Sequence, residues 1–228
     1  MTENNTSQPN IPQNKKAAKK AVAAQLINEQ RTELVNTLHQ VEPTAPTLCE
    51  GWQARHMVAH LILRETSPLT AAGVIGGPLE QRTNQKTNEL ADSLTDKLRY
   101  EQAIERFAHL PGHLKMRQRF PSADRKMNLI EYFVHIEDVR RAGGQHDPRE
   151  LSREVQEAIW SDVRSRAKLM AGKNYPHGLV LEAPGYVDMT CTVVKPKDNI
   201  PATILSGEPA ELALYLFGRE EVAQVSVS

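Results

Sequence analysis

The segment from Asn128 to Arg141 constrains the fold more than any other part of the chain, because a helix drawn through it has almost no face for water. A helix that is apolar on every side has to be covered by other elements. We therefore expect this segment to lie mostly buried inside a helical bundle. Its apolar residues are Leu129, Ile130, Phe133, Val134, Ile136 and Val139.

Other segments with apolar residues at helical spacing precede and follow it, and prolines and glycines separate them. After Gly178 the pattern changes to short apolar runs between turn residues, which indicates strands and one short helix near Pro209. The chain is thus predicted to be mainly α with a small α+β part. The predicted helices are 15–41, 52–67, 79–91, 94–110, 124–142 and 147–171, and the predicted strands are 179–181, 187–194, 203–205 and 222–227.

These patterns divide the chain into three parts. Residues 1–14 are rich in Asn, Gln, Thr and Pro, and we expect them to form a disordered tail. Residues 15–175 form the predicted helical bundle, and residues 176–228 form the predicted α+β domain. Within the bundle, Asp147-Pro-Arg-Glu150 is a strong start signal for the last helix, with Asp as N-cap and Pro in the first turn.

The composition argues against several classes of partner. Lys+Arg and Asp+Glu both total 28, so the formal net charge is zero and nothing suggests nucleic acid or an anionic membrane surface. No apolar run approaches the roughly 20 residues that span a bilayer, and the N-terminal residues lack the apolar core of a signal peptide. Cys49 and Cys191 are the only cysteines, so a disulfide framework is not expected and a cytoplasmic location is.

Polar residues on the buried helix point to a metal. Glu131, His135 and Asp138 stand at i, i+4 and i+7, hence on one stripe. Burying a carboxylate and an imidazole is costly unless they are paired, hydrogen-bonded or coordinated. His60 has apolar neighbours on both sides in another predicted helix, and with Glu131 and His135 it would complete a His₂-carboxylate set. That set is typical of a catalytic zinc site with an open position, although nickel, iron or manganese accept similar ligands.

From spacing alone, a plainer interpretation stays open. A buried histidine is usually a hydrogen-bonded core residue, and Glu131 with His135 can be only a side-chain pair within one helix. Trp52 is more simply a buried structural residue than a cavity wall. Cys49 has Glu50 beside it and no obvious base, which argues against a nucleophilic role.

Two further residues are candidates for a supporting role. His56 stands one turn before the predicted ligand of its helix, next to Arg55, and is expected to be exposed or to lie behind the ligands. Asp138 could orient His135 by accepting a hydrogen bond from the imidazole, although such a contact within one helix is awkward. Its plain alternative is an ion pair with Arg141 or Arg64.

At this point two motifs resemble a known family. The stretch from Thr47 to Leu61 and the stretch from Glu131 to Arg141 together resemble the mycothiol-dependent maleylpyruvate isomerase family, and more closely an actinobacterial branch described as metal-binding proteins. The stretch from Gly207 to Arg219 is similar to the family's C-terminal segment. The resemblance implies a DinB-like four-helix bundle followed by a sterol-carrier-like α+β C-terminal domain.

The resemblance also implies a chemistry. Carried over to matching positions, the family's ligands are His60, Glu131 and His135, holding a divalent metal, zinc. The metal would bind and deprotonate a small thiol such as mycothiol, which adds to a double bond in an isomerase or displaces a leaving group in an S-transferase. Arg219, which follows the family's Gly-Arg, could act as a catalytic residue that binds a substrate carboxylate, or it could simply end a helix at the surface.

Two other functions stay open at this stage. The ion could brace a non-catalytic protein through a closed shell that includes His56 or Asp138, or it could activate water in a metal-dependent hydrolase. His56 departs from the family, which more often has Asp there. The expected partners are a small-molecule substrate and a low-molecular-weight thiol, with neither nucleic acid nor a membrane. The chain is expected to be a monomer or a homodimer.

Overall fold

The computed structural model describes residues 11–67, 80–110, 124–171, 174–197 and 200–228. Within them the chain is mainly helical and carries one small four-stranded sheet near its end, as the sequence predicts. None of the described helices is both long and apolar enough to cross a bilayer. The helices are α1 (Ile11–His39), α2 (Ala54–Thr66), α4 (Glu80–Asp92), α5 (Lys97–Ala108), α6 (Asp124–Ala142), α7 (Arg153–Ala171) and α8 (Pro209–Leu216).

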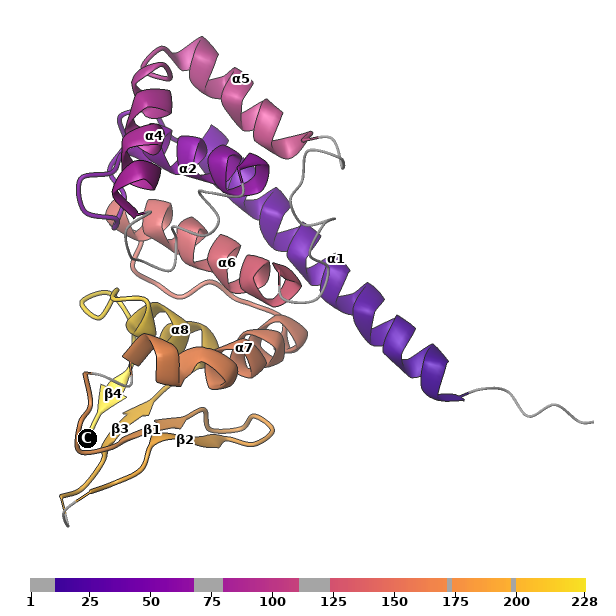
Figure 1. Cartoon of the computed structure of the whole chain (residues 1–228), viewed down its shortest axis with the longest axis vertical. Helices are drawn as coiled ribbons and strands as arrows, with labels where there is room; N and C mark the ends of the chain where they lie inside the picture. The colour runs from indigo at the N-terminus through magenta and orange to yellow at the C-terminus, as the bar shows by residue number, and fades with distance from the viewer. Residues whose placement is uncertain (1–10, 68–79, 111–123, 172–173, 198–199) are drawn as a thin grey trace, which may run out of the picture.

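Helix α6 occupies the middle of the molecule. It packs against α1 on one side and against α7 and α8 on another, while α2 packs against α4 and α5 (Figure 1). All described residues of α6 from Asn128 to Val139 are buried. The predicted bounds of this helix, 124–142, are those of the structure. Its burial also agrees with the prediction, because a helix that is apolar on every side has to be covered by other elements.

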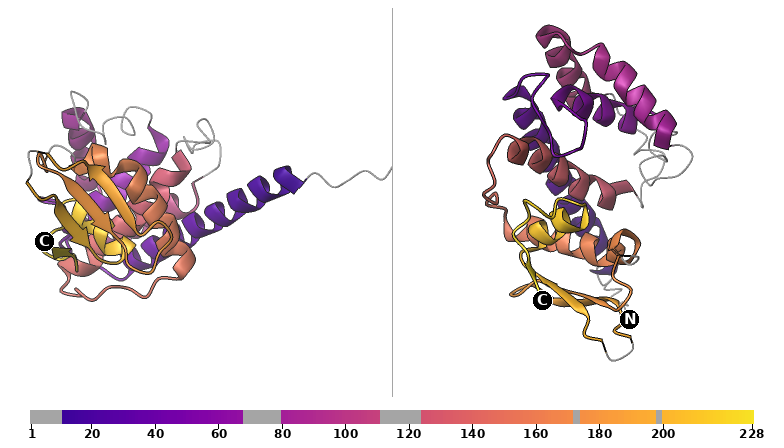
Figure 2. Two further views of the ribbon diagram at one scale, coloured as in Figure 1. Left: turned by 90° about the horizontal axis from the view of Figure 1, so that it is seen from below. Right: turned by 90° about the vertical axis from the view of Figure 1, so that its left-hand side faces the viewer.

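The sheet consists of β1 (Leu179–Glu182), β2 (Thr190–Val194), β3 (Thr203–Ser206) and β4 (Ser226–Val227), in the order β2-β1-β3-β4. β1 pairs antiparallel with β2 and parallel with β3, and β3 pairs antiparallel with β4. Helices α7 and α8 separate the sheet from α6, and the other face of the sheet points away from the bundle (Figures 1 and 2).

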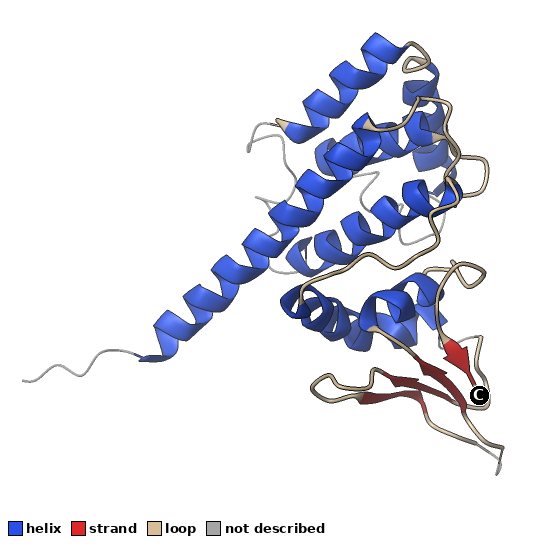
Figure 3. Cartoon of the chain, turned by 180° about the vertical axis from the view of Figure 1, so that it is seen from behind, coloured by secondary structure: helices blue, strands red, loops and turns tan. Residues whose placement is uncertain are grey.

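The packing of α7 bears on the division of the chain. α7 packs mainly against α8 and also contacts β2, so it forms one layer with α8 over the sheet (Figure 3). α7, which the sequence prediction assigns to the bundle, thus packs mainly against a helix of the predicted C-terminal domain. The division near residue 175 stays a prediction.

The start of α7 is a correction to the sequence prediction. Residues 147–152 are not helical, and α7 begins at Arg153, with the Ser152 hydroxyl accepting from the Val155 backbone N–H at 3.4 Å. Arg149 explains the difference, because its Nε donates to Glu137 at 2.5 Å and its Nη2 donates to Gln30 at 3.2 Å. These long-range contacts hold the Asp-Pro-Arg-Glu stretch against the bundle and outweigh its local helix-start signal.

Other boundaries also differ from prediction. α1 begins at Ile11 rather than Lys15, so residues 11–14 of the predicted tail are helical, in keeping with Pro12 in the first turn. The last strand covers only Ser226–Val227 and β2 begins at Thr190, so both are shorter than predicted. Residues 1–10 of the predicted tail and the small-residue connection after α2 lie outside the described residues.

Two buried charge networks tie the layers together. Arg31 of α1 bonds with Glu65 of α2, the Phe107 carbonyl of α5 and, at 3.0 Å, the Tyr132 hydroxyl of α6. It thereby joins four helices.

The second network connects α6 with α8. Arg141, 1 % exposed, donates to Glu137 at 2.8 Å and to the two carboxylate oxygens of Glu211 at 2.6 and 3.1 Å. Removing one partner of such a buried pair is strongly destabilising, since the other charge is left without compensation. This contact fixes the C-terminal unit on α6.

Candidate metal centre

Two helices bring the predicted ligands together. His60 lies in the middle of α2, while Glu131 and His135 lie one turn apart on α6 and so share a face. One ligand atom from each of the three lies within 4.8 Å of the other two, and all three residues are buried. The sequence prediction of a common cluster is consistent with this geometry.

The distances within the cluster resemble those between ligands of one ion. Nε2 of His60 is 3.5 Å from Oε1 of Glu131, and Nε2 of His135 is 3.2 Å from the same oxygen. Zinc bonded to nitrogen and oxygen at about 2.05 Å keeps neighbouring ligand atoms of a tetrahedron about 3.3 Å apart. Both contacts also fall within hydrogen-bonding range, although they are longer than the roughly 2.7–2.9 Å of a charge-assisted bond. The donor set and its spacing therefore fit a zinc-sized divalent ion.

The protonation states follow from burial and charge. Burial lowers the pKa of His60, which favours the neutral imidazole that a metal requires. Burial by itself would raise the pKa of Glu131, but the nearby Arg64 guanidinium and the hydrogen bonds from His135 and His60 hold it well below its usual value. Arg64 Nε is 3.3 Å from Oε1 of Glu131. The cluster thus offers a permanent carboxylate.

Asp138 orients His135, the third predicted ligand. Its Oδ2 lies 3.0 Å from Nδ1 of His135, so Nδ1 carries the proton and Nε2 faces the cluster. Burial opposes a charge on His135, yet hydrogen bonds to Asp138, Cys49 and Glu131 raise its pKa well above the usual value. The contact within one helix that the sequence made doubtful is therefore present.

Arg219 holds Asp138 in place. Its Nε donates to Oδ1 of Asp138 at 2.7 Å and its Nη2 donates to Oδ2 at 2.9 Å, while Nη1 donates to the Phe217 carbonyl. The plain alternative predicts an ion pair of Asp138 with Arg141 or Arg64. In the structure Asp138 pairs with Arg219 instead. The guanidinium is largely buried, which differs from the interpretation of Arg219 as a surface residue.

A second group of potential metal ligands lies next to Nδ1 of His135. Cys49 Sγ, His135 Nδ1 and Asp138 form a group that could hold a metal by distance alone. Cys49 donates to Asp138 at 3.2 Å, and Arg219 Nη2 is 3.1 Å from Cys49 Sγ. Both carboxylate oxygens of Asp138 and the Cys49 sulfur already accept from Arg219. Two imidazoles with one carboxylate are also a more usual zinc set, so His60, Glu131 and His135 are the stronger candidates for a metal.

His56 and Trp52 have roles other than ligation. His56 is buried at 8 % exposure rather than exposed, and its Nδ1 accepts from the Gln53 backbone N–H at 3.1 Å, so it caps the start of α2. It belongs to neither candidate metal cluster among the described residues. The Trp52 ring lies 5.2 Å from the His60 ring, so this half-buried tryptophan contacts a predicted ligand.

Two neighbours of the cluster did not emerge from the sequence as site residues. Arg64 follows His60 by one turn of α2, and Asn128 precedes Glu131 by one turn of α6. Arg64 Nη1 donates to Oδ1 of Asn128 at 2.7 Å. Their spacing from the ligands, i+4 and i−3, is the signal that could have found them.

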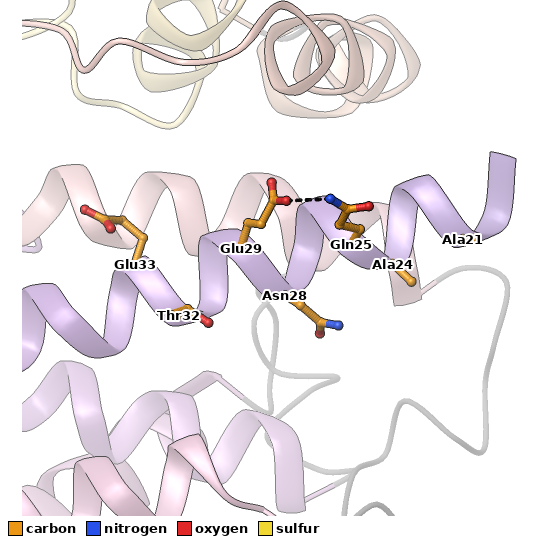
Figure 4. Close-up of a pocket in the computed structure, with 7 residues that line it drawn as sticks. All are labelled: Ala21, Ala24, Gln25, Asn28, Glu29, Thr32 and Glu33. Atoms are coloured by element: carbon orange, nitrogen blue, oxygen red, sulfur yellow. Dashed lines mark hydrogen bonds between the residues drawn. The ribbon is translucent and has the colours of Figure 1, made fainter. Parts of the chain in front are cut away.

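A cavity elsewhere on the molecule is of a different kind. A hollow of about 720 Å³ lies along α1, and all of its lining residues come from that one helix (Figure 4). Gln25 donates to Glu29 within it at 2.9 Å. A ligand site normally gathers polar groups from several elements, so we assign no function to this hollow. It is lined by Ala21, Ala24, Gln25, Asn28, Glu29, Thr32 and Glu33.

Comparison with known proteins identifies the family and the fold. The sequence profile of the mycothiol maleylpyruvate isomerase N-terminal domain matches residues 24–140, slightly more than half of the chain. No curated protein is significantly similar in sequence. Two crystal structures of the mycothiol-dependent maleylpyruvate isomerase, one of them of a histidine-to-alanine mutant, share the fold. Their TM-scores are 0.56 and, for the mutant, 0.59, at 16% identity and with 92% of each chain covered.

Proposed function

Because this chain belongs to the family of the mycothiol maleylpyruvate isomerase N-terminal domain, we propose that it is a metal-dependent enzyme that uses a small thiol. In this proposal His60, Glu131 and His135 hold one divalent ion, zinc. The bundle is of the DinB-like four-helix type, the C-terminal unit is sterol-carrier-like, and the protein is cytoplasmic. The reaction is an isomerisation, with S-transfer as the related alternative.

The spacing of the three ligand atoms carries the proposal. Two nitrogens at 3.5 and 3.2 Å from one carboxylate oxygen match two edges of a zinc tetrahedron, and all three ligand atoms lie within 4.8 Å of one another. The described residues supply three ligands at this point and no fourth, and each keeps 6–8 % of its surface exposed. Three ligands with access for a further one favour catalysis over a closed structural site.

The remaining residues of the site prepare it for a thiol. A divalent metal here would lower the pKa of a bound thiol and so make a thiolate available at neutral pH. Asp138 fixes the ring of His135, and Arg64 keeps Glu131 ionised. Both contacts preserve the ligand geometry, which has to be accurate for an open site to bind a small ligand in one orientation.

The first test is the metal content of the purified protein after repletion with zinc. One zinc per chain is expected in the parent, and a large loss is expected in His60→Ala and Glu131→Gln with the helical content preserved. His56→Ala is the matched control, since it removes an equally buried imidazole from the same helix. Zinc retained in both ligand variants would contradict the site.

The second test addresses the thiol. Cobalt in place of zinc gives a sulfur-to-metal absorption band in the near ultraviolet when a thiolate coordinates. We expect mycothiol to produce this band, and the loaded protein with mycothiol to isomerise maleylpyruvate. A bound metal without the band and without turnover would favour the hydrolase or the structural alternative.

A further inference from the structure

The side chain of Asn128 is held in one orientation beside the candidate metal site. Arg64 Nη1 lies 2.7 Å from its Oδ1, and because a guanidinium can only donate, this amide atom has to be the oxygen. The orientation of the amide is thus fixed by chemistry. Asn128 is fully buried, and Arg64 is 7 % exposed.

The other end of this amide lacks a partner. Nδ2 of Asn128 is buried and donates to none of the described residues. Buried amide groups are almost always hydrogen-bonded, so an unused donor at a fixed position calls for an acceptor that binds there. Its neighbours on α6 are informative, since Asn128, Glu131 and His135 stand at i, i+3 and i+7 and share the face that carries the ligands.

The charges around the site indicate what that acceptor is. Among the described residues, Glu131 is the carboxylate of the cluster, and Arg64 lies 3.3 Å from it; a divalent ion bound here would add two positive charges. Asp138 is already balanced by Arg219. With the ion bound, the described residues next to Asn128 would carry a net positive charge together with it and would favour an oxygen that carries, or acquires, negative charge.

We propose that the side-chain amide of Asn128 donates a hydrogen bond to the carbonyl oxygen of an unsaturated oxo acid and stabilises the negative charge that develops there. This inference rests on the proposed thiol function. Arg64 acts as a positioning residue, since it fixes the amide through Oδ1. The class of substrate is a small carboxylic acid in which a carbon–carbon double bond is conjugated to a carbonyl group.

The chemistry balances without another reactant. When sulfur bonds to the carbon β to the carbonyl, the π electrons of the double bond move to the carbonyl oxygen and give an enolate. The former double bond is then single and can rotate. Return of the electron pair restores the double bond and expels the thiolate, so nothing is oxidised or reduced. Asn128 acts where the enolate oxygen carries the charge, as the donors of an oxyanion hole do.

The test compares two substitutions that separate donation from acceptance. Asn128→Asp keeps the oxygen that accepts from Arg64 but loses the donor and adds a negative charge, whereas Asn128→Ala loses both. If Asn128 only serves Arg64, the Asp variant should resemble the parent and the Ala variant should be worse. If Asn128 donates to the ligand, the order is reversed.

Binding of pyruvate to the zinc-loaded protein is the first readout, because pyruvate is a small oxo acid and needs no thiol. We expect affinity to fall roughly 10-fold in Asn128→Ala and further in Asn128→Asp, with zinc content unchanged. Turnover of maleylpyruvate with mycothiol should fall about 100-fold in kcat. Thr87→Val is the control, since it removes a buried hydroxyl of α4 that also lacks a partner among the described residues.

The outcomes separate this inference from the proposed function. Equal pyruvate affinity in the parent and both variants, or no binding by the parent, would overturn the role of Asn128. Absence of the thiolate band in the cobalt protein would instead overturn the thiol function. Loss of zinc in both Asn128 variants would also count against the inference, because it would make Asn128 a support for the ligands.

Discussion

Arg219 donates two hydrogen bonds to Asp138, from Nε to Oδ1 at 2.7 Å and from Nη2 to Oδ2 at 2.9 Å, although 81 positions separate the two residues. Asp138 in turn accepts from Nδ1 of His135 at 3.0 Å. A residue that follows α8 therefore orients a predicted metal ligand in the bundle. Four predictions follow from this and from the other contacts described above.

The chain of contacts from Arg219 to His135 predicts a graded loss of metal affinity. Asp138→Asn should weaken zinc binding about 10–100-fold, because the imidazole loses a charged partner. Arg219→Met should cost less, since it lies one contact further from the ligand. Competition with a chromophoric chelator measures both, and Arg153→Met, a change on the exposed side of α7, should leave the affinity unchanged.

Comparing turnover with zinc affinity in Arg219→Met distinguishes two roles of Arg219. If Arg219→Met reduces turnover far more than it reduces zinc affinity, then Arg219 contacts the substrate, as the family resemblance implies for a catalytic residue. A fall in turnover that follows zinc loading would instead limit Arg219 to orienting Asp138.

Removal of the metal should destabilise the protein without unfolding it. The apolar core that surrounds α6 does not depend on the ion, so the helical content should persist. Zinc at about 1,000 times its Kd stabilises the folded state by about 4 kcal/mol, and chelation should lower Tm accordingly. Circular dichroism during a thermal scan, with and without chelator, measures this. Loss of helix on chelation at 25 °C would contradict the prediction and favour a structural ion.

The contact between Arg141 and Glu211 should contribute strongly to stability. Arg141→Met leaves Glu211 buried without its partner and should cost about 3–5 kcal/mol in the free energy of unfolding. The double variant with Glu211→Gln should recover part of this loss, because no carboxylate then remains uncompensated. Urea titration of the three proteins measures the effect, and equal stability of single and double variants would mean that the pair is not coupled.

Gly178, directly before β1, should not tolerate a side chain. Its φ is +137°, and a Cβ there would lie 2.8 Å from Cβ of Ala202 and 3.0 Å from Cα of Pro196. Gly185 is the matched control, since its φ is +87° but a Cβ meets nothing within 4 Å. Gly185→Ala should cost about 1–2 kcal/mol for conformation alone, and Gly178→Ala should cost more. Similar losses would show that the sheet shifts to make room for the added methyl group.

The sequence predicts those features of the structure that depend on residues close together along the chain. The bounds of α6 and the position of α2 followed from apolar spacing, and the small sheet near the end followed from short runs between turn residues. The shared face of Glu131 and His135 followed from helix geometry. Each of these depends on residues within a few turns of one another.

Long-range contacts account for the errors. The sequence predicts too early a start for α7, because no local pattern reveals that Arg149 bonds with Glu137 and Gln30. In the same way, the plain alternative for Asp138 is an ion pair with Arg141 of its own helix or Arg64 of α2, whereas its partner is Arg219. A side chain that becomes buried takes the partner that the fold brings near, and the sequence alone leaves several candidates equivalent.

The double attachment of α8 and the turn after it to α6 has a consequence for how such proteins diverge. Glu211 bonds with Arg141 and Arg219 bonds with Asp138, and these two residues of α6 lie within one helical turn of each other. Replacing the C-terminal unit by an unrelated domain would therefore disturb the site. The replacement would have to supply an arginine that contacts Asp138 and a glutamate that contacts Arg141. The two parts of the chain are expected to have been inherited together.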